Sequence, residues 1–203
     1  MRILTKVRQY QSPRLRVNIT SVLSLLIVNS DNFPPTAYDT EFKGAGLDTM
    51  SYAPPSASIP ATQWPTLGSL IDSGKRLLTF MDASADFNSV SYIIDGACST
   101  LRLVICICSN SVMLEFTNIW ESPYDVTTTF DCSVNRTQGN SSTQMYLINH
   151  FLDALVLGVP VPDPSQANQT NAVSGQNSLG EQVSLCVSEY GRNPNFMLVD
   201  VSP

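Results

Sequence analysis

The stretch Val22-Leu-Ser-Leu-Leu-Ile-Val-Asn-Ser-Asp31 shows the pattern that decides the fold: an apolar run of strand length followed at once by polar residues. Four further runs share it. They are Arg76–Met81 before Asp82, Tyr92–Ile94 before Asp95, Met145–Ile148 before Asn149-His150, and Phe196–Val199 before Asp200. Runs without polar alternation are typical of strands buried on both faces, as in parallel sheets. We therefore predict five parallel strands.

Helical segments separate some of these runs. Pro35–Gly46 has apolar residues at helical spacing, Thr66–Ser73 begins at a threonine cap, and Ser178–Tyr190 carries an apolar stripe that ends at Gly191. Alternating strands and helices predict an α/β fold with right-handed crossovers. Polar residues at the strand ends favour a barrel rim or a doubly wound crevice. No glycine-rich phosphate loop follows a strand, which disfavours a dinucleotide-binding fold.

Charge is unevenly distributed along the 203 residues, whose net charge is -6 and whose sequence pI is about 4.6. An acidic chain argues against nucleic acid as a partner. Residues 1–20 nevertheless hold five of the eleven basic residues and no acidic ones. We interpret them as a basic tail that is not native to the fold, with a mitochondrial presequence as the alternative.

The glycosylation sequons and the cysteines indicate the cellular location of the protein. Asn135, Asn140 and Asn168 begin N-x-S/T sequons in polar, loop-like stretches, which favours glycosylation and an extracellular location. No signal peptide is recognisable, so we expect the native N-terminus to be missing. Of the five cysteines, Cys132 and Cys186 stand alone in polar surroundings, and we predict a disulfide between them. We expect no metal site, because the remaining cysteines lack a second pair and a nearby histidine.

Four strings resemble the fungal PLC-like phosphodiesterases, within the superfamily of phosphatidylinositol-specific phospholipase C catalytic domains. The strings are Leu25-Leu-Ile-Val-Asn-Ser-Asp-Asn32, Trp64-Pro-Thr-Leu-Gly-Ser-Leu-Ile-Asp-Ser-Gly-Lys-Arg76, Met145-Tyr-Leu-Ile-Asn-His-Phe151 and Tyr190-Gly-Arg-Asn-Pro-Asn-Phe-Met-Leu-Val-Asp200. The resemblance runs from about Ser21 to Val201. It implies a TIM-type (β/α)8 barrel of which this chain holds approximately strands 4 to 8, so residues 21–201 would form an incomplete barrel.

The family cleaves phosphodiesters with two histidines, one as general base and one as general acid, both on early strands. His150 is the chain's only histidine and lies on a late strand. We expect it to have a structural or substrate-shell role, the catalytic role being the less favoured alternative. The resemblance therefore implies a phosphoric diester hydrolase for lipid head-group or glycosylphosphatidyl substrates, with this chain a truncated, inactive form. The alternative is a non-catalytic secreted binding or cell-surface module that retains the pocket.

The resemblance assigns the substrate pocket to residues at the ends of late strands. The candidates are Asn29, Asp31, Asp82, Asp95, Asn149, His150 and Asp200, with Trp120 and Tyr124 either lining the mouth or packing in the core. The implied partner of the full-length parent is a phospholipid or phosphoinositide-like head group, with peripheral membrane contact. No cofactor is evident, and Ca²⁺ stays open for the parent.

Residues 96–114 interrupt the resemblance between Asp95 and Glu115. They are apolar, contain three cysteines and carry one charge, Arg102. We interpret the segment as a retained intron. A lineage-specific insertion, either a hairpin or a membrane-dipping loop that anchors the protein, is the alternative.

Overall fold

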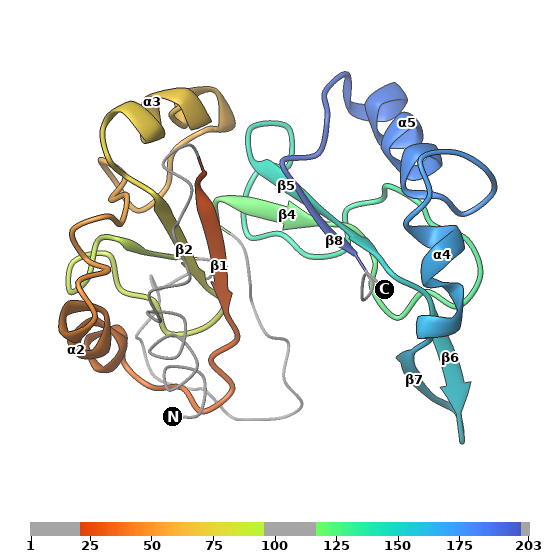
Figure 1. Cartoon of the computed structure of the whole chain (residues 1–203), viewed down its shortest axis with the longest axis horizontal. Helices are drawn as coiled ribbons and strands as arrows, with labels where there is room; N and C mark the ends of the chain where they lie inside the picture. Colours follow the sequence, from red (N-terminus) through yellow and green to blue (C-terminus); the bar gives the residue numbers. More distant parts are fainter. Residues whose placement is uncertain (1–20, 96–116, 200–203) are drawn as a thin grey trace. The chain divides into compact units, whose positions relative to one another are not determined.

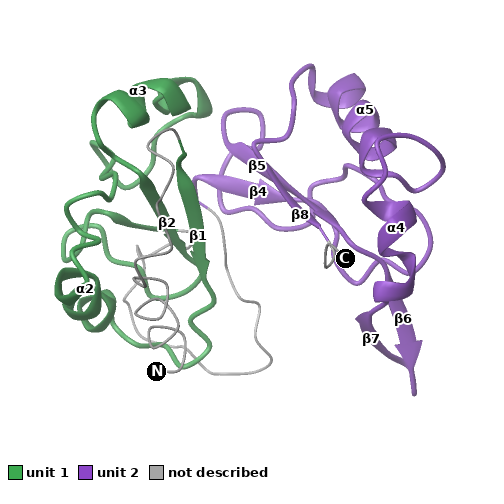
Figure 2. Ribbon diagram, in the orientation of Figure 1, with its two compact units in different colours: residues 1–115 green, residues 116–203 purple. Residues whose placement is uncertain are grey.

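The computed structural model describes residues 21–95 and 117–199. The chain divides into two compact units, Met1–Glu115 and Phe116–Pro203 (Figure 2). The predictions made for the basic tail, for residues 96–114 and for Asp200 lie outside the described residues. Within them, no helix is long and apolar enough to cross a bilayer.

Unit 1 is built on a parallel sheet of order β1-β2-β3 (Figure 1). Its strands are β1 (Leu23–Ile27), β2 (Leu77–Met81) and β3 (Ile93–Asp95). Leu23 pairs with Leu77, and Thr79 pairs with Ile93. Three of the predicted strands are thus confirmed, together with their parallel direction.

The crossover from β1 to β2 contains the helices α2 (Pro35–Gly44), η1 (Ala61–Gln63) and α3 (Leu67–Asp72). The Thr66 side chain accepts a hydrogen bond from the Ser69 backbone N–H, so the predicted cap begins α3. Phe42 of α2 is fully buried against Ile27, Met81 and Ile93 of the sheet. Burial of this apolar face holds α2 on the sheet, and the Tyr38 hydroxyl of α2 donates to Oδ1 of Asn29 beyond the end of β1.

Unit 2 contains a second parallel sheet, of order β4-β5-β8. Its strands are β4 (Ile119–Glu121), β5 (Met145–His150) and β8 (Phe196–Val199). The sequence predicted β5 and β8 but not β4. Between β5 and β8 lie an antiparallel hairpin of β6 (Asp153–Val156) and β7 (Val159–Pro162), the short helices η2 (Pro164–Gln166) and α4 (Ala167–Thr170), and α5 (Leu179–Tyr190).

The core of unit 2 is aromatic and is crossed by a disulfide. Trp120 stacks on Tyr146 with ring centroids 4.6 Å apart, and Tyr190 of α5 packs on both rings. Cys132 and Cys186 are bonded within the same cluster, which confirms the predicted disulfide. The bond fastens the loop after β4 to α5, so this loop is held next to the end of β5.

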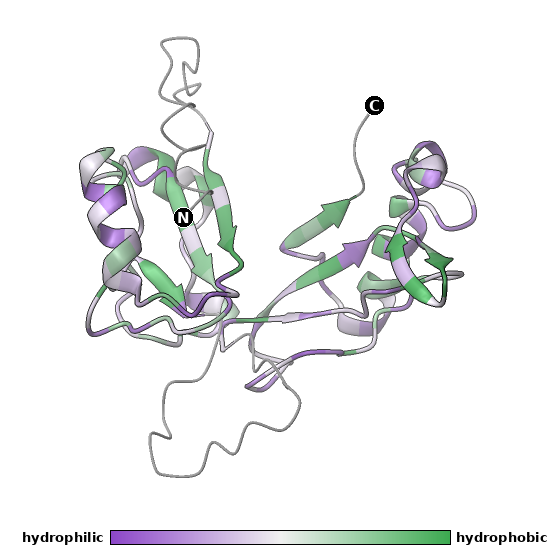
Figure 3. Ribbon diagram, turned by 90° about the horizontal axis from the view of Figure 1, so that it is seen from below, coloured by the Kyte–Doolittle hydropathy of each residue, from purple (hydrophilic) through white to green (hydrophobic). Residues whose placement is uncertain are grey.

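The strands differ sharply in burial. Every residue of β2, β3 and β4 is buried, whereas β1 and β8, each at an edge of its sheet, expose large apolar side chains. The exposed side chains are Leu23, Leu26, Met197, Leu198 and Val199. Figure 3 shows the strands as the apolar parts of the ribbon. The fold is therefore a mixed α/β arrangement, and its described strands form two small parallel sheets and a hairpin rather than a closed barrel.

Candidate functional site

Three predicted residues lie at one edge of the unit 1 sheet. Asn29 follows β1, Asp82 follows β2 and Asp95 ends β3, and all three are buried. Because the strands are parallel, their carboxyl ends meet at this edge, which is where α/β folds bind ligands. The sequence pattern therefore brought these three residues to one edge, which we call the carboxyl edge of unit 1.

Asn29 joins the loops at this edge through its hydrogen bonds. Its side-chain amide donates to the carbonyl oxygens of Phe33 and Ala83, both at 2.9 Å, and its Oδ1 accepts from the Phe33 N–H and the Tyr38 hydroxyl. Its backbone N–H donates to Oδ1 of Asp82 at 2.7 Å. These bonds use the full capacity of the amide. Asn29 therefore positions the loops after β1 and β2 and has no group left to contact a ligand.

Asp31 and Asp82 are acidic residues of this edge, together with Asp95. Asp31 is exposed, whereas Asp82 is buried except for about 5 % of its surface. Burial raises the pKa of the Tyr38 hydroxyl, and the charges of the two carboxylates raise it further. Carboxylates accept hydrogen bonds from hydroxyl groups and repel phosphate. The edge is therefore suited to the hydroxyls of a polyol.

Two residues beyond the same strand ends have a positive backbone φ, which residues other than glycine rarely adopt. Asn32 has φ +53° and Ser84 has φ +63°, and the Ser84 hydroxyl bonds Oδ1 of Asn32 at 3.4 Å. Such conformations persist where the surroundings enforce them, and they are enriched at ligand sites. Here the hydrogen bonds from Asn29 to Phe33 and Ala83 hold the neighbouring backbone in this conformation.

In unit 2, Asn149 and His150 end β5. The Asn149 backbone N–H donates to Oγ of Ser122, and its side-chain amide donates to the Ser122 carbonyl. Asn149 therefore fastens the end of β5 to the residue that follows β4. Ser122 is fully buried, and no sequence pattern singled it out as a site residue.

His150 is completely buried, and both of its ring nitrogens have partners. Nδ1 lies 2.6 Å from Oε1 of Gln182, and Nε2 lies 2.8 Å from the Thr170 carbonyl oxygen. The Phe130 ring covers the imidazole, with centroids 4.1 Å apart. Neither nitrogen is available to exchange a proton with a substrate in this geometry. The contacts favour the structural role expected for His150, since they join β5 to α4 and α5.

The two aromatic candidates pack within unit 2. Trp120 is fully buried in the core, and its Nε1 donates to the Ser141 carbonyl, so it does not line a mouth. Tyr124 is 41 % exposed and lies under the Arg136 guanidinium, which is 4.5 Å from its ring centroid. Trp120 therefore packs in the core, whereas Tyr124 keeps part of its ring exposed.

Arg136 also forms an ion pair with Glu121, which is the last residue of β4 and is buried. This ion pair was not predicted from the sequence. The signal was the one used elsewhere, an acidic residue at a strand end, but Ile119–Glu121 was too short to be recognised as a strand. The three sequon asparagines Asn135, Asn140 and Asn168 are all exposed, as glycosylation requires.

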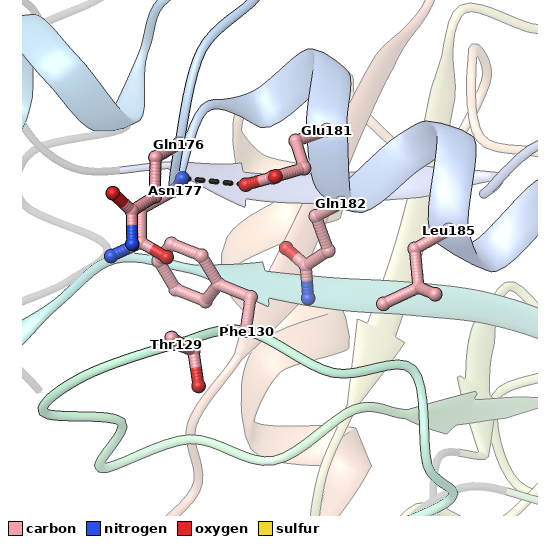
Figure 4. A pocket seen from close by; sticks show the side chains of 7 residues that line it. All are labelled: Thr129, Phe130, Gln176, Asn177, Glu181, Gln182 and Leu185. Carbon is pink, nitrogen blue, oxygen red and sulfur yellow. Dashed lines mark hydrogen bonds between the residues drawn. The ribbon is translucent and has the colours of Figure 1, made fainter.

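The described residues also form a cavity of about 280 Å³ beside the first turns of α5 (Figure 4). Phe130, Leu185 and several polar side chains, among them Gln182, line it. Glu181 and Gln182 already bond within unit 2, to the Asn177 backbone N–H and to the Asp131 carbonyl. None of the predicted pocket residues lines this cavity. No group of three or more metal-ligating side chains occurs in the described part of the chain.

Comparisons with known proteins bear on this arrangement. The family model PI-PLC X 1 matches residues 2–98 and 107–202. The PI-PLC X domain-containing protein 1 of Arthroderma benhamiae (strain ATCC MYA-4681 / CBS 112371) is 37 % identical over 183 residues, which are 88 % of this chain and 53 % of that protein. A protein of the same organism described as an uncharacterized secreted protein is 35 % identical over 195 residues, 92 % of this chain and 40 % of that protein.

The chain thus spans about half the length of the curated relatives it matches. No solved structure matches it. The break in the family match, at residues 99–106, falls inside the segment where the sequence resemblance was interrupted. Since the match covers nearly the whole chain, the chain belongs to the PI-PLC X domain family.

Proposed function

We propose that this chain supplies the later-strand wall of a phosphodiesterase pocket that holds the polyol head group of a phosphoinositide-like or glycosylphosphatidyl lipid. The observation that carries the proposal is the carboxyl edge of unit 1, where the exposed Asp31 and the buried Asp82 follow neighbouring parallel strands. Asp31 is exposed there and would accept hydrogen bonds from head-group hydroxyls. Family membership supports the link to phosphodiester chemistry.

The same proposal includes an incomplete TIM-type barrel. Parallel strands are normally covered on both faces. The edge strands β1 and β8 instead expose Leu26 and Met197, at 41 % and 50 % of their surface. Neighbouring strands of a larger barrel would cover such edges. The relatives, about twice as long as the matched region, have the additional length to supply them.

Acid–base catalysis by this chain alone is not part of the proposal. A two-histidine mechanism needs an acid and a base in separate positions, and the chain has one histidine, whose ring nitrogens both have partners. We infer a secreted chain that binds the head group without cleaving it. Exposed sequons, the disulfide and a relative named as secreted support that location.

Calorimetric titration of the full chain with glycerophosphoinositol tests the binding. Asp31→Asn should weaken binding at least about fivefold, because a charge-assisted hydrogen bond to a hydroxyl is lost. Asp72→Asn is the matched control, since Asp72 is exposed at the end of α3, before β2 begins. Equal affinities for the two variants, or no binding by the unaltered chain, would overturn the proposed site.

Hydrolysis is measured separately, as release of inositol phosphate from phosphatidylinositol vesicles. The expected result is no release above that of buffer. Release that disappears in His150→Gln would show that the chain is catalytic and would refute the non-catalytic part of the proposal, whatever the titration gives.

A further inference from the structure

The β6–β7 hairpin of unit 2 is unusual because its tip is apolar. Leu155, Val156, Leu157 and Val159 expose 63 %, 53 %, 101 % and 59 % of their surface. Hairpin tips normally carry Asn, Asp or Gly. Here Leu157 occupies the first turn position with φ +53° and Gly158 the second with φ +80°, the geometry of a type I′ turn. A leucine that is fully exposed in a left-handed conformation has no local structural reason to be there.

The apolar surface surrounds the tip instead of covering one side. Side chains of a strand alternate between its faces, so Leu155 and Val156 point to opposite sides of the hairpin. Leu157 projects from the turn between them. From Ala154 to Pro162 the hairpin carries no charged residue. Docking on a protein surface would bury one side only, whereas an apolar medium would bury both sides and the turn.

The β7 edge of the hairpin is also protected against pairing with another strand. Val156 and Val159 flank the two-residue turn and form a hydrogen-bonded pair. Because hydrogen-bonded and non-hydrogen-bonded pairs alternate, the backbone groups of the next pair, Leu155 and Pro160, point away from the hairpin. Pro162 occupies the second outward position on β7, opposite Asp153. Since proline has no N–H, the outer edge of β7 lacks both donors that strand addition would use. The same lack removes two groups that are costly to place in lipid.

The base of the hairpin is firmly anchored. The Asp153 backbone N–H donates to the Val126 carbonyl, and the Asp163 N–H donates to the Leu152 carbonyl, both at 2.8 Å. Leu152 and Asp153 are buried, in contrast to the tip. The hairpin starts three residues after His150 and projects away from the rest of unit 2 (Figure 1). The hairpin therefore extends its tip beyond the carboxyl end of β5 from a hydrogen-bonded base.

We propose that the β6–β7 tip inserts into the interfacial region of a lipid bilayer, with Leu155, Val156, Leu157 and Val159 as the inserted side chains. The attraction is apolar, so it requires no anionic lipid and changes little with salt. The inference goes beyond the head-group site and does not depend on it. Phosphatidylcholine vesicles, which lack an inositol head group, therefore test it separately.

The experiment measures co-sedimentation of the full chain with phosphatidylcholine vesicles in 0.5 M salt. Leu157→Asn creates the Asn-Gly pair that type I′ turns prefer, so the hairpin should be at least as stable as before. Binding should nevertheless fall about tenfold, because the most exposed apolar side chain is lost. Val173→Ser is the matched control: Val173 is 90 % exposed in the same unit, outside the hairpin, and its loss should leave binding unchanged.

A second readout reports insertion directly. Tryptophan emission of Leu157→Trp should shift to the blue when vesicles are added and should be quenched by brominated lipid, whereas Val173→Trp should show neither effect. Equal binding of Leu157→Asn and the unaltered chain, or no quenching of Leu157→Trp, would overturn the proposal. So would a dimer, seen by sedimentation without vesicles, that Leu157→Asn dissociates, because the tip would then serve a second copy.

Discussion

Removing the Cys132–Cys186 disulfide should unfold unit 2 selectively. The two cysteines are 54 residues apart, and the closed loop contains β5, the β6–β7 hairpin and most of α5. Chain entropy lost by the unfolded state on closing a loop of this length corresponds to about 4 kcal/mol. Both sulfur atoms also lie in the fully buried core, so Cys132→Ala with Cys186→Ala removes packing as well. The expected loss in the free energy of unfolding is at least about 4 kcal/mol.

The chain's two tryptophans allow each unit to be followed separately, because Trp64 lies in unit 1 and Trp120 in unit 2. Trp64 packs on Tyr52 and Phe80, and Trp120 stacks on Tyr146. In a Trp64→Phe background, urea unfolding followed by fluorescence reports on unit 2. With an m-value of about 1.3 kcal/mol/M for a unit of this size, the midpoint should fall by about 3 M.

The control is the Trp120→Phe background, in which Trp64 reports on unit 1 and its midpoint should change by less than about 0.5 M. The other three cysteines are replaced by serine in all variants, which prevents disulfide exchange. A fall of less than about 1 M in the unit 2 midpoint would show that the bond contributes little. An equal fall in both units would show that the chain unfolds as one cooperative body, and the reasoning from separate units would be wrong.

Three further predictions concern single side chains. Asn29→Ala should lower the stability of unit 1 by about 3 kcal/mol in the same urea assay, because the partly buried Ala83 carbonyl and Tyr38 hydroxyl lose their hydrogen-bond partner. Glu121→Gln should lower that of unit 2 by about 3 kcal/mol, since its arginine partner loses its buried counter-charge. Burial alone would raise the pKa of Asp39, but hydrogen bonds from Lys43 and Tyr92 outweigh it and lower that pKa. The resulting stability is present above the unfolded pKa of about 4 and is lost as pH falls through the lower folded pKa. Tyr92→Phe should therefore flatten the fall in unit 1 stability between about pH 5 and pH 2.

The strands that the sequence predicted share one physical property: both faces are apolar and a polar residue follows. That property located β1, β2, β3, β5 and β8. β4 was not predicted because it consists of Ile119–Glu121 alone, which is too short to show an apolar run followed by a polar residue. The hairpin escaped because its prolines normally argue against a strand and its turn is Leu157-Gly158 instead of Asn-Gly.

The site was predictable in position but not in role. Polar strand ends were placed at the carboxyl edge by topology alone, as for Asn29 and Asp82. Whether such a residue contacts a ligand depends on partners far away in sequence. Ala83, whose carbonyl oxygen accepts a hydrogen bond from the Asn29 side chain, is 54 residues from Asn29 in the sequence. Gln182, whose side chain bonds the His150 ring, is 32 residues from His150. A sequence pattern does not encode these pairings, so it could not separate a positioning residue from a ligand-binding one.

We expect two features of this chain to attract it to a membrane for different physical reasons, and the salt dependence of binding distinguishes them. The basic residues of positions 1–20 would bind an anionic surface by Coulomb attraction, which is screened within about 8 Å at physiological ionic strength. The hairpin tip binds by burial of apolar area, which salt does not screen. On phosphatidylserine vesicles at low salt, Leu157→Asn should therefore still bind, and raising the salt to 0.5 M should release it. The unaltered chain should remain bound under the same change. Release of both proteins to the same extent would show that the charge of the first twenty residues, and not the hairpin, holds the chain at the surface.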